Sequence, residues 1–147
     1  RSCDIAFATS DPPRKVSKQG FMLFPRIREI DALLIARPEL RGRIFETHPE
    51  VSFLQMNGGL PAALPKKIKS RASRAGLEER AKLLLAAGMP PNFLETMNRP
   101  PRGAGGDDVL DAVACAWTAR RILRGEAAVY PDPVPKDAHG IEMAIRA

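Results

Sequence analysis

The sequence has few cysteines, few aromatic residues and no long uninterrupted apolar run. Its two cysteines, Cys3 and Cys115, have neither CxxC spacing nor a nearby histidine, so a thiolate zinc site is excluded. A single disulfide would be a poor scaffold for 147 residues, and reduced thiols in a cytoplasmic protein are the simpler interpretation. No segment approaches the roughly 18–20 uncharged apolar residues of a membrane span, so we expect no membrane partner.

The length and composition are those of a single domain over residues 1–147. Apolar residues make up 44% and charged residues 27%, which argues against wholesale disorder. The chain begins at Arg1 rather than Met, so we expect a piece of a longer protein whose first strands lie upstream. Strand edges left uncovered in such a piece would favour a homo-oligomer.

Most of the positive charge lies in one segment. The net charge is +6, and residues 61–82 hold seven basic residues against two acidic ones. This asymmetry favours an anionic partner such as nucleic acid, although a solvated, partly mobile loop also explains it. Lys66 and Lys67 are the predicted phosphate contacts, with Arg80 on the following helix. Because the aromatic residues are only six Phe, one Trp and one Tyr, we expect contact to the backbone rather than stacking on bases.

Apolar periodicity and breaks at proline and glycine predict an α/β protein. Helices are predicted over residues 26–37, 49–56, 77–87 and 108–124, strands over 43–47 and 141–145, and a loop over 89–106. The strand at 43–47 is expected to be buried, and the very apolar helix at 108–124 to lie against a sheet. The strands are too few for a complete sheet, which again indicates a missing N-terminal portion.

Three carboxylates, Asp107, Asp108 and Asp111, open the last helix. Capping explains one of them readily and a second plausibly, because Asp accepts backbone N–H bonds at a helix start and faces the positive end of the dipole. Asp111 lies a full turn further on among apolar residues, on the same face as Asp108. Two buried carboxylates side by side need a cation or donor between them. Capping and a metal site are therefore equal alternatives for Asp108 and Asp111.

Glu46 extends the acidic pattern to a strand end, where sheets present side chains to ligands, although a Glu there is also ordinary. A helix-start role explains His48 and Glu50, with a metal-ligand or supporting role as the alternative. Glu46, Asp108 and Asp111 together suit Mg²⁺ or Mn²⁺, which prefer carboxylate oxygens. Two such ions can hold the attacking and leaving oxygens of a phosphodiester.

Several motifs occur in a fixed order along the chain. They are Glu46-Thr47-His48-Pro49-Glu50 with Phe53, Lys66-Lys67, Arg80 with Leu83-Leu84, and Asp107-Asp108-Val109-Leu110-Asp111-Ala112. With Arg1-Ser2-Cys3-Asp4 and Ile27-Arg28-Glu29-Ile30-Asp31, this series resembles a bacterial family of unknown function described as predicted nucleases with an RNase H-like fold. The resemblance implies a three-layer α/β core. It also implies an acidic site with Glu46 on the fourth strand, Asp108 and Asp111 on the final helix, and a first-strand Asp upstream of Arg1.

We therefore predict a metal-dependent nuclease in which Glu46, Asp108 and Asp111 bind Mg²⁺ or Mn²⁺. His48 would orient the attacking water or a carboxylate. The alternative is a non-catalytic module of the same fold that binds nucleic acid or a phosphorylated ligand, with the acids as caps. A nucleotide-binding protein is disfavoured, because Gly103, Gly105 and Gly106 form neither a P-loop nor a GxGxxG motif.

Overall fold

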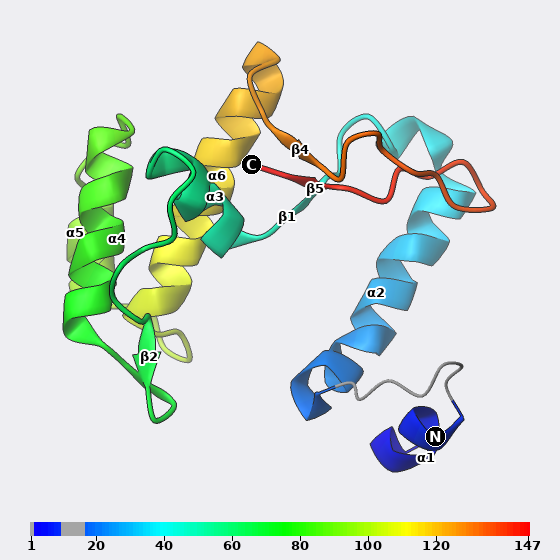
Figure 1. The fold of residues 1–147 in the computed structure, drawn as a ribbon, viewed down its shortest axis with the longest axis horizontal. Helices are drawn as coiled ribbons and strands as arrows, with labels where there is room; N and C mark the ends of the chain where they lie inside the picture. The colour runs from blue at the N-terminus through cyan, green and yellow to red at the C-terminus, as the bar shows by residue number, and fades with distance from the viewer. Residues whose placement is uncertain (1, 10–16) are drawn as a thin grey trace. The chain divides into compact units, whose positions relative to one another are not determined.

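The computed structural model describes residues 2–9 and 17–147 (Figure 1). The sequence predicts one domain, whereas the contacts divide the chain into two compact units, Arg1–Ile44 and Phe45–Ala147. Helices dominate, and two small sheets complete a mixed α/β structure. None of the described helices combines the length and the apolar character that crossing a membrane requires.

The first unit consists of helices α1 (Cys3–Ala8) and α2 (Lys18–Ala36) and the 3-10 helix η1 (Pro38–Leu40). α2 begins well before the predicted start at residue 26, because the Ser17 hydroxyl caps it by accepting from Gly20 N at 3.0 Å. Pro25 therefore lies inside the helix rather than ahead of it. Among the residues described in this unit, none is buried.

The second unit contains a sheet of three two-residue strands in the order β1-β5-β4. β1 (Glu46–Thr47) runs parallel to β5 (Ile145–Arg146), and β4 (Val129–Tyr130) runs antiparallel to β5. The predicted buried strand at 43–47 is wrong, because only Glu46 and Thr47 find partners on β5 and Glu46 is exposed. The end strand likewise begins at Ile145 rather than at 141.

Four helices build the core of this unit: α3 (Pro49–Met56), α4 (Arg74–Ala86), α5 (Phe93–Asn98) and α6 (Gly106–Arg124). α6 packs against the other three, so the expectation that it lies against a sheet is wrong (Figure 1). α5 lies in the predicted loop, where Phe93 supplies a buried ring. The apolar core comprises Phe53, Ala81, Leu84, Phe93, Leu110 and Ala114.

A second, two-stranded sheet precedes α4. β2 (Lys67–Ile68) pairs antiparallel with β3 (Arg71–Ala72), and both turn residues, Lys69 and Ser70, have positive φ values of 47° and 65°. This is the backbone of a type I′ hairpin turn. α4 then begins at Arg74, earlier than the predicted residue 77, because Ser73 caps it.

Candidate functional site

The β2–β3 hairpin places basic side chains at the surface. Lys67, Lys69, Arg71 and Arg74 are all exposed. The basic segment of the sequence is therefore a folded hairpin that leads into a helix and presents its cations to solvent. Such a surface matches the charge of a phosphate backbone.

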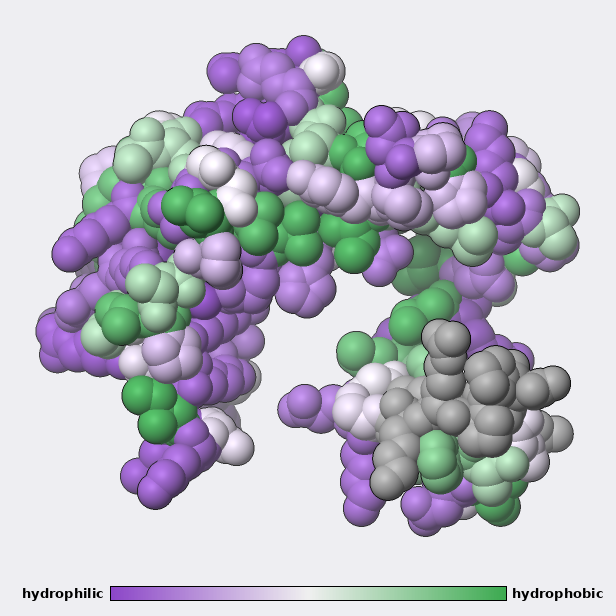
Figure 2. Space-filling view, viewed as in Figure 1, coloured by the Kyte–Doolittle hydropathy of each residue, from purple (hydrophilic) through white to green (hydrophobic). Residues whose placement is uncertain are grey.

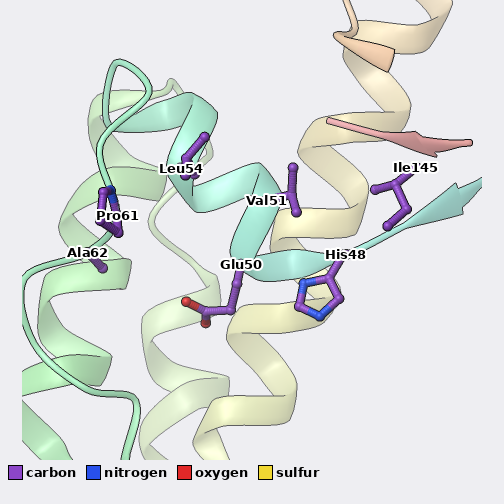
Figure 3. A pocket seen from close by; sticks show the side chains of 7 residues that line it. All are labelled: His48, Glu50, Val51, Leu54, Pro61, Ala62 and Ile145. Carbon is purple, nitrogen blue, oxygen red and sulfur yellow. The ribbon is translucent and has the colours of Figure 1, made fainter. Parts of the chain in front are cut away.

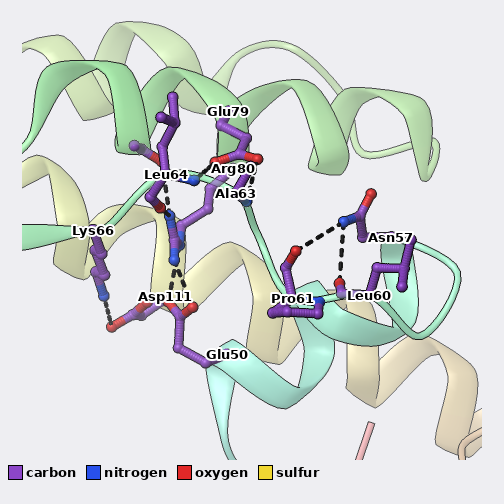
Figure 4. Close-up of polar contacts among 11 residues, drawn as sticks. Glu50, Asn57, Leu60, Pro61, Ala63, Leu64, Lys66, Glu79, Arg80 and Asp111 are labelled. Atoms are coloured by element: carbon purple, nitrogen blue, oxygen red, sulfur yellow. Dashed lines mark hydrogen bonds and ion pairs between the residues drawn. The ribbon is translucent and has the colours of Figure 1, made fainter.

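The segment before the hairpin, residues 60–66, is held against α4 by polar contacts (Figure 4). The Glu79 carboxylate accepts from the backbone N–H groups of Ala63 and Leu64, both at 2.8 Å. These two bonds lower the pKa of Glu79, because they stabilise its charged form. Arg80, the next residue of α4, donates from Nη1 to Leu64 O at 3.1 Å. The base of the hairpin is thus fixed relative to α4.

Two lysines at this base meet two aspartates in the first turns of α6. Lys66 Nζ lies 2.5 Å from Asp111 Oδ2, and Lys67 Nζ lies 2.9 Å from Asp107 Oδ2. The hydrogen bond from Lys67 lowers the pKa of Asp107, and the same bond raises the pKa of Lys67. Lys67 is 55% exposed and Lys66 only 18%, so Lys67 is the more accessible cation.

Asp111 keeps one oxygen outside its ion pair. Its Oδ1 is buried and has no hydrogen-bond donor among the described residues. A buried acceptor without a donor is costly, which is why most such groups are paired. This oxygen is therefore a position at which a ligand or cation could bind.

Asp108 is not part of the two ion pairs that Lys66 and Lys67 form with Asp111 and Asp107. Its Oδ2 accepts from Gly105 N at 2.7 Å, which makes it the cap of α6, and its side chain is exposed. α6 starts at Gly106, two residues before the predicted start, so Asp108 takes the third helical position, from which a side chain reaches back to the N-cap. The carboxylates on the lysine-facing side are Asp107 and Asp111, and their i,i+4 spacing was the signal for them.

Glu46 and His48 lie on and beside β1. His48 is the N-cap of α3, although its side chain makes no capping bond, and Pro49 is the first helical residue as predicted. His48 and Glu50 line an apolar pocket of about 340 Å³ whose walls include Val51 (Figure 3). The structure places no three His, Cys, Asp or Glu side chains together as metal ligands within the described ranges. The predicted set of Glu46, Asp108 and Asp111 is therefore not assembled.

Arg80 is a structural residue, and its predicted role as a phosphate contact is wrong. It is 4% exposed, and its Nε and Nη2 donate to the two oxygens of Glu50 at 2.9 and 2.6 Å. Its Nη1 also bonds Gly76 O at 3.0 Å, and its guanidinium lies 5.6 Å from the centre of the Phe53 ring. A guanidinium held in this way joins α3 to α4 and is not available to a ligand.

Comparison with known proteins identifies the family to which this chain belongs. No curated protein and no solved structure matches it. A family match covers residues 1–136. The chain belongs to the family described as "Protein of unknown function (DUF429)".

Proposed function

We propose that this protein is a nuclease that binds the phosphate backbone of nucleic acid at the start of α6 and hydrolyses it. The observation that supports this proposal is the meeting of Lys66 and Lys67 with Asp111 and Asp107. An RNase H-like fold is part of the proposal. The ordered acidic and basic motifs support it, and so does the parallel pairing of β1 with β5.

The hairpin would supply the binding energy. Lys67, Lys69 and Arg71 are exposed along it, and such cations neutralise phosphates without reading the bases. A bound phosphate would compete with Asp107 for Lys67, whose flexible stem allows its ammonium group to change partners. Binding of the backbone would thus free a carboxylate next to the bound phosphate.

The carboxylates would bind a divalent ion jointly with the substrate. Mg²⁺ commonly takes one or two protein carboxylates, completed by waters and substrate phosphates. Asp107 and Asp111 provide two, and the buried Oδ1 of Asp111, which no donor of the described residues reaches, suits a cation. When bound, Mg²⁺ or Mn²⁺ would neutralise charge on the phosphate and activate water. This assignment retains Asp111 from the sequence prediction and uses Asp107 in place of Asp108.

The test is cleavage of end-labelled DNA and RNA oligonucleotides in the presence of Mg²⁺ or Mn²⁺. We expect Asp111→Asn to lower the cleavage rate by about two orders of magnitude or more, because it removes charge at the reacting phosphate. The matched control is Asp108→Asn, whose amide oxygen can still accept the Gly105 N–H bond. Equal rates for the two variants, or no cleavage by the unaltered protein, would overturn the proposal.

A non-catalytic nucleic-acid-binding protein is the second candidate. The observation that favours it is that each aspartate at the start of α6 has a partner: Lys67 for Asp107, Lys66 for Asp111 and Gly105 N for Asp108. Mn²⁺ raises the melting temperature only if the folded protein binds it. A rise that disappears in Asp111→Asn favours the nuclease. Oligonucleotide binding with no response to Mn²⁺ favours the binding protein.

A further inference from the structure

A second cationic site lies at the opposite end of α6 from the hairpin. A pocket of about 330 Å³ opens there, and Figure 2 shows mainly hydrophilic residues over this end of the helix, at the top of the view. The polar and aromatic residues that line this pocket are Arg120, Arg121, Arg124, Trp117, Gln55 and Glu126.

Two of the arginines, Arg120 and Arg121, use some of their N–H donors in hydrogen bonds to backbone carbonyls. Arg120 donates to Ala87 O at 2.8 Å and to Gly88 O at 3.2 Å, which satisfies carbonyls at the end of α4. Arg121 donates from Nη2 to Glu126 O, and its guanidinium lies 4.8 Å from the centre of the Trp117 ring. Helix capping therefore accounts for Arg120 and for one nitrogen of Arg121.

Capping does not account for the remaining donors. Arg121 Nε is buried, and no acceptor among the described residues reaches it. Arg124 is exposed and forms no ion pair in the part of the chain that the structure describes. A buried N–H without an acceptor is unfavourable, so these groups favour a ligand that offers oxygen acceptors.

The pocket carries a net positive charge, which favours an anionic ligand with oxygen acceptors. Three guanidinium groups face one carboxylate, that of Glu126. The C-termini of α4 and α6 add roughly half a negative charge each, which leaves a net charge of about +1. Guanidinium groups match phosphate oxygens in geometry, because their N–H donors lie in a planar fork.

We propose that this pocket binds a phosphate group, with Arg121 and Arg124 as its ligands. The proposal does not depend on the nuclease function or on the hairpin. The phosphate could be free or part of a nucleic-acid backbone. α6 has 19 residues and is therefore about 28 Å long. A strand that contacts both ends must accordingly span about eight nucleotides at 3.4 Å per phosphate.

Trp117 provides a direct readout, because it is the only tryptophan of the chain and Arg121 covers its ring. Inorganic phosphate titrated into the protein should change the Trp117 fluorescence with saturation. We expect Arg124→Gln to weaken this binding at least about tenfold, since it removes a charge-assisted contact. The matched control is Arg26→Gln, an equal charge change at an exposed position of α2, and it should leave the titration unchanged.

A phosphate titration without saturation would overturn the proposal, and so would equal affinities in Arg124→Gln and the unaltered protein. Lys67→Gln separates this site from the hairpin: it should weaken oligonucleotide binding and leave the phosphate titration intact. Equal loss of phosphate binding in Lys67→Gln would place the phosphate at the hairpin and contradict the proposal. Oligonucleotides of four and twelve nucleotides identify the source. If Arg124→Gln lowers the affinity for the twelve-nucleotide oligonucleotide but not for the four-nucleotide one, the pocket holds a backbone phosphate.

Discussion

Arg80 and Glu50 form a two-point ion pair across the interface of α4 and α3, with both N–H···O distances below 3.0 Å. The Arg80 side chain is 4% exposed and that of Glu50 is 41% exposed. The pair thus lies at the edge of the core, with the cation inside and the carboxylate reaching solvent. Its planar two-point geometry fixes the orientation of the two helices at this contact.

Removal of Glu50 should destabilise the protein strongly. Glu50→Ala leaves the buried Arg80 guanidinium without its carboxylate, and we expect the free energy of unfolding to fall by about 3 kcal/mol, as for other broken buried pairs. Urea denaturation measures this change. Glu78→Ala is the matched control, because it breaks an exposed pair with Arg74 and should have little effect. Similar losses in both variants would contradict the role assigned to Arg80.

Replacement of Gly76 by alanine should loosen the 60–66 segment. A Cβ at Gly76 would lie 2.1 Å from Pro65 O, so the segment must move away from α4. We expect Gly76→Ala to lower the free energy of unfolding by about 2–3 kcal/mol. Gly42→Ala is the control, since a Cβ there meets no atom within 4 Å. If thermal denaturation gives the two variants the same melting temperature, the close approach at Pro65 is refuted.

The ion pair of Asp107 with Lys67 should make stability depend on pH in the acid range. The pKa of Asp107 is lowered from 3.8 by the Lys67 hydrogen bond. A lowered pKa in the folded state means that the contribution to stability is complete above about pH 4 and is lost as the pH falls through the folded-state value. We expect Lys67→Met to return the Asp107 pKa toward its ordinary value, as measured by NMR titration of the side-chain carboxyl. An unchanged pKa in Lys67→Met would show that another group lowers it.

Local patterns predicted the helices with clear ends and failed for short elements. The predicted bounds 49–56 match α3, and the predicted end at residue 124 matches the end of α6. α5 was missed because prolines and glycines flank a six-residue helix on both sides. Strands of two residues cannot show an alternating pattern, so β4 left no signal and β1 and β5 were overextended.

The candidate site was predicted by residue type but not by arrangement. Lys66 and Asp111 were both selected, yet nothing in the sequence shows that they meet, because 45 positions separate them. Arg80 was assigned to the surface because its partner Glu50 lies 30 positions away on another helix. Asp108 was preferred to Asp107 because it lies three residues before Asp111, whereas in the structure Asp108 caps α6 and Asp107, four residues before Asp111, pairs with a lysine.

β5 lies between β1 and β4, and it follows both of them in the chain. On the ribosome, β1 and β4 therefore leave the exit tunnel before the strand that joins them. Until that strand emerges, neither β1 nor β4 has its partner in this sheet. Completion of the sheet thus follows the synthesis of all four core helices, α3 to α6.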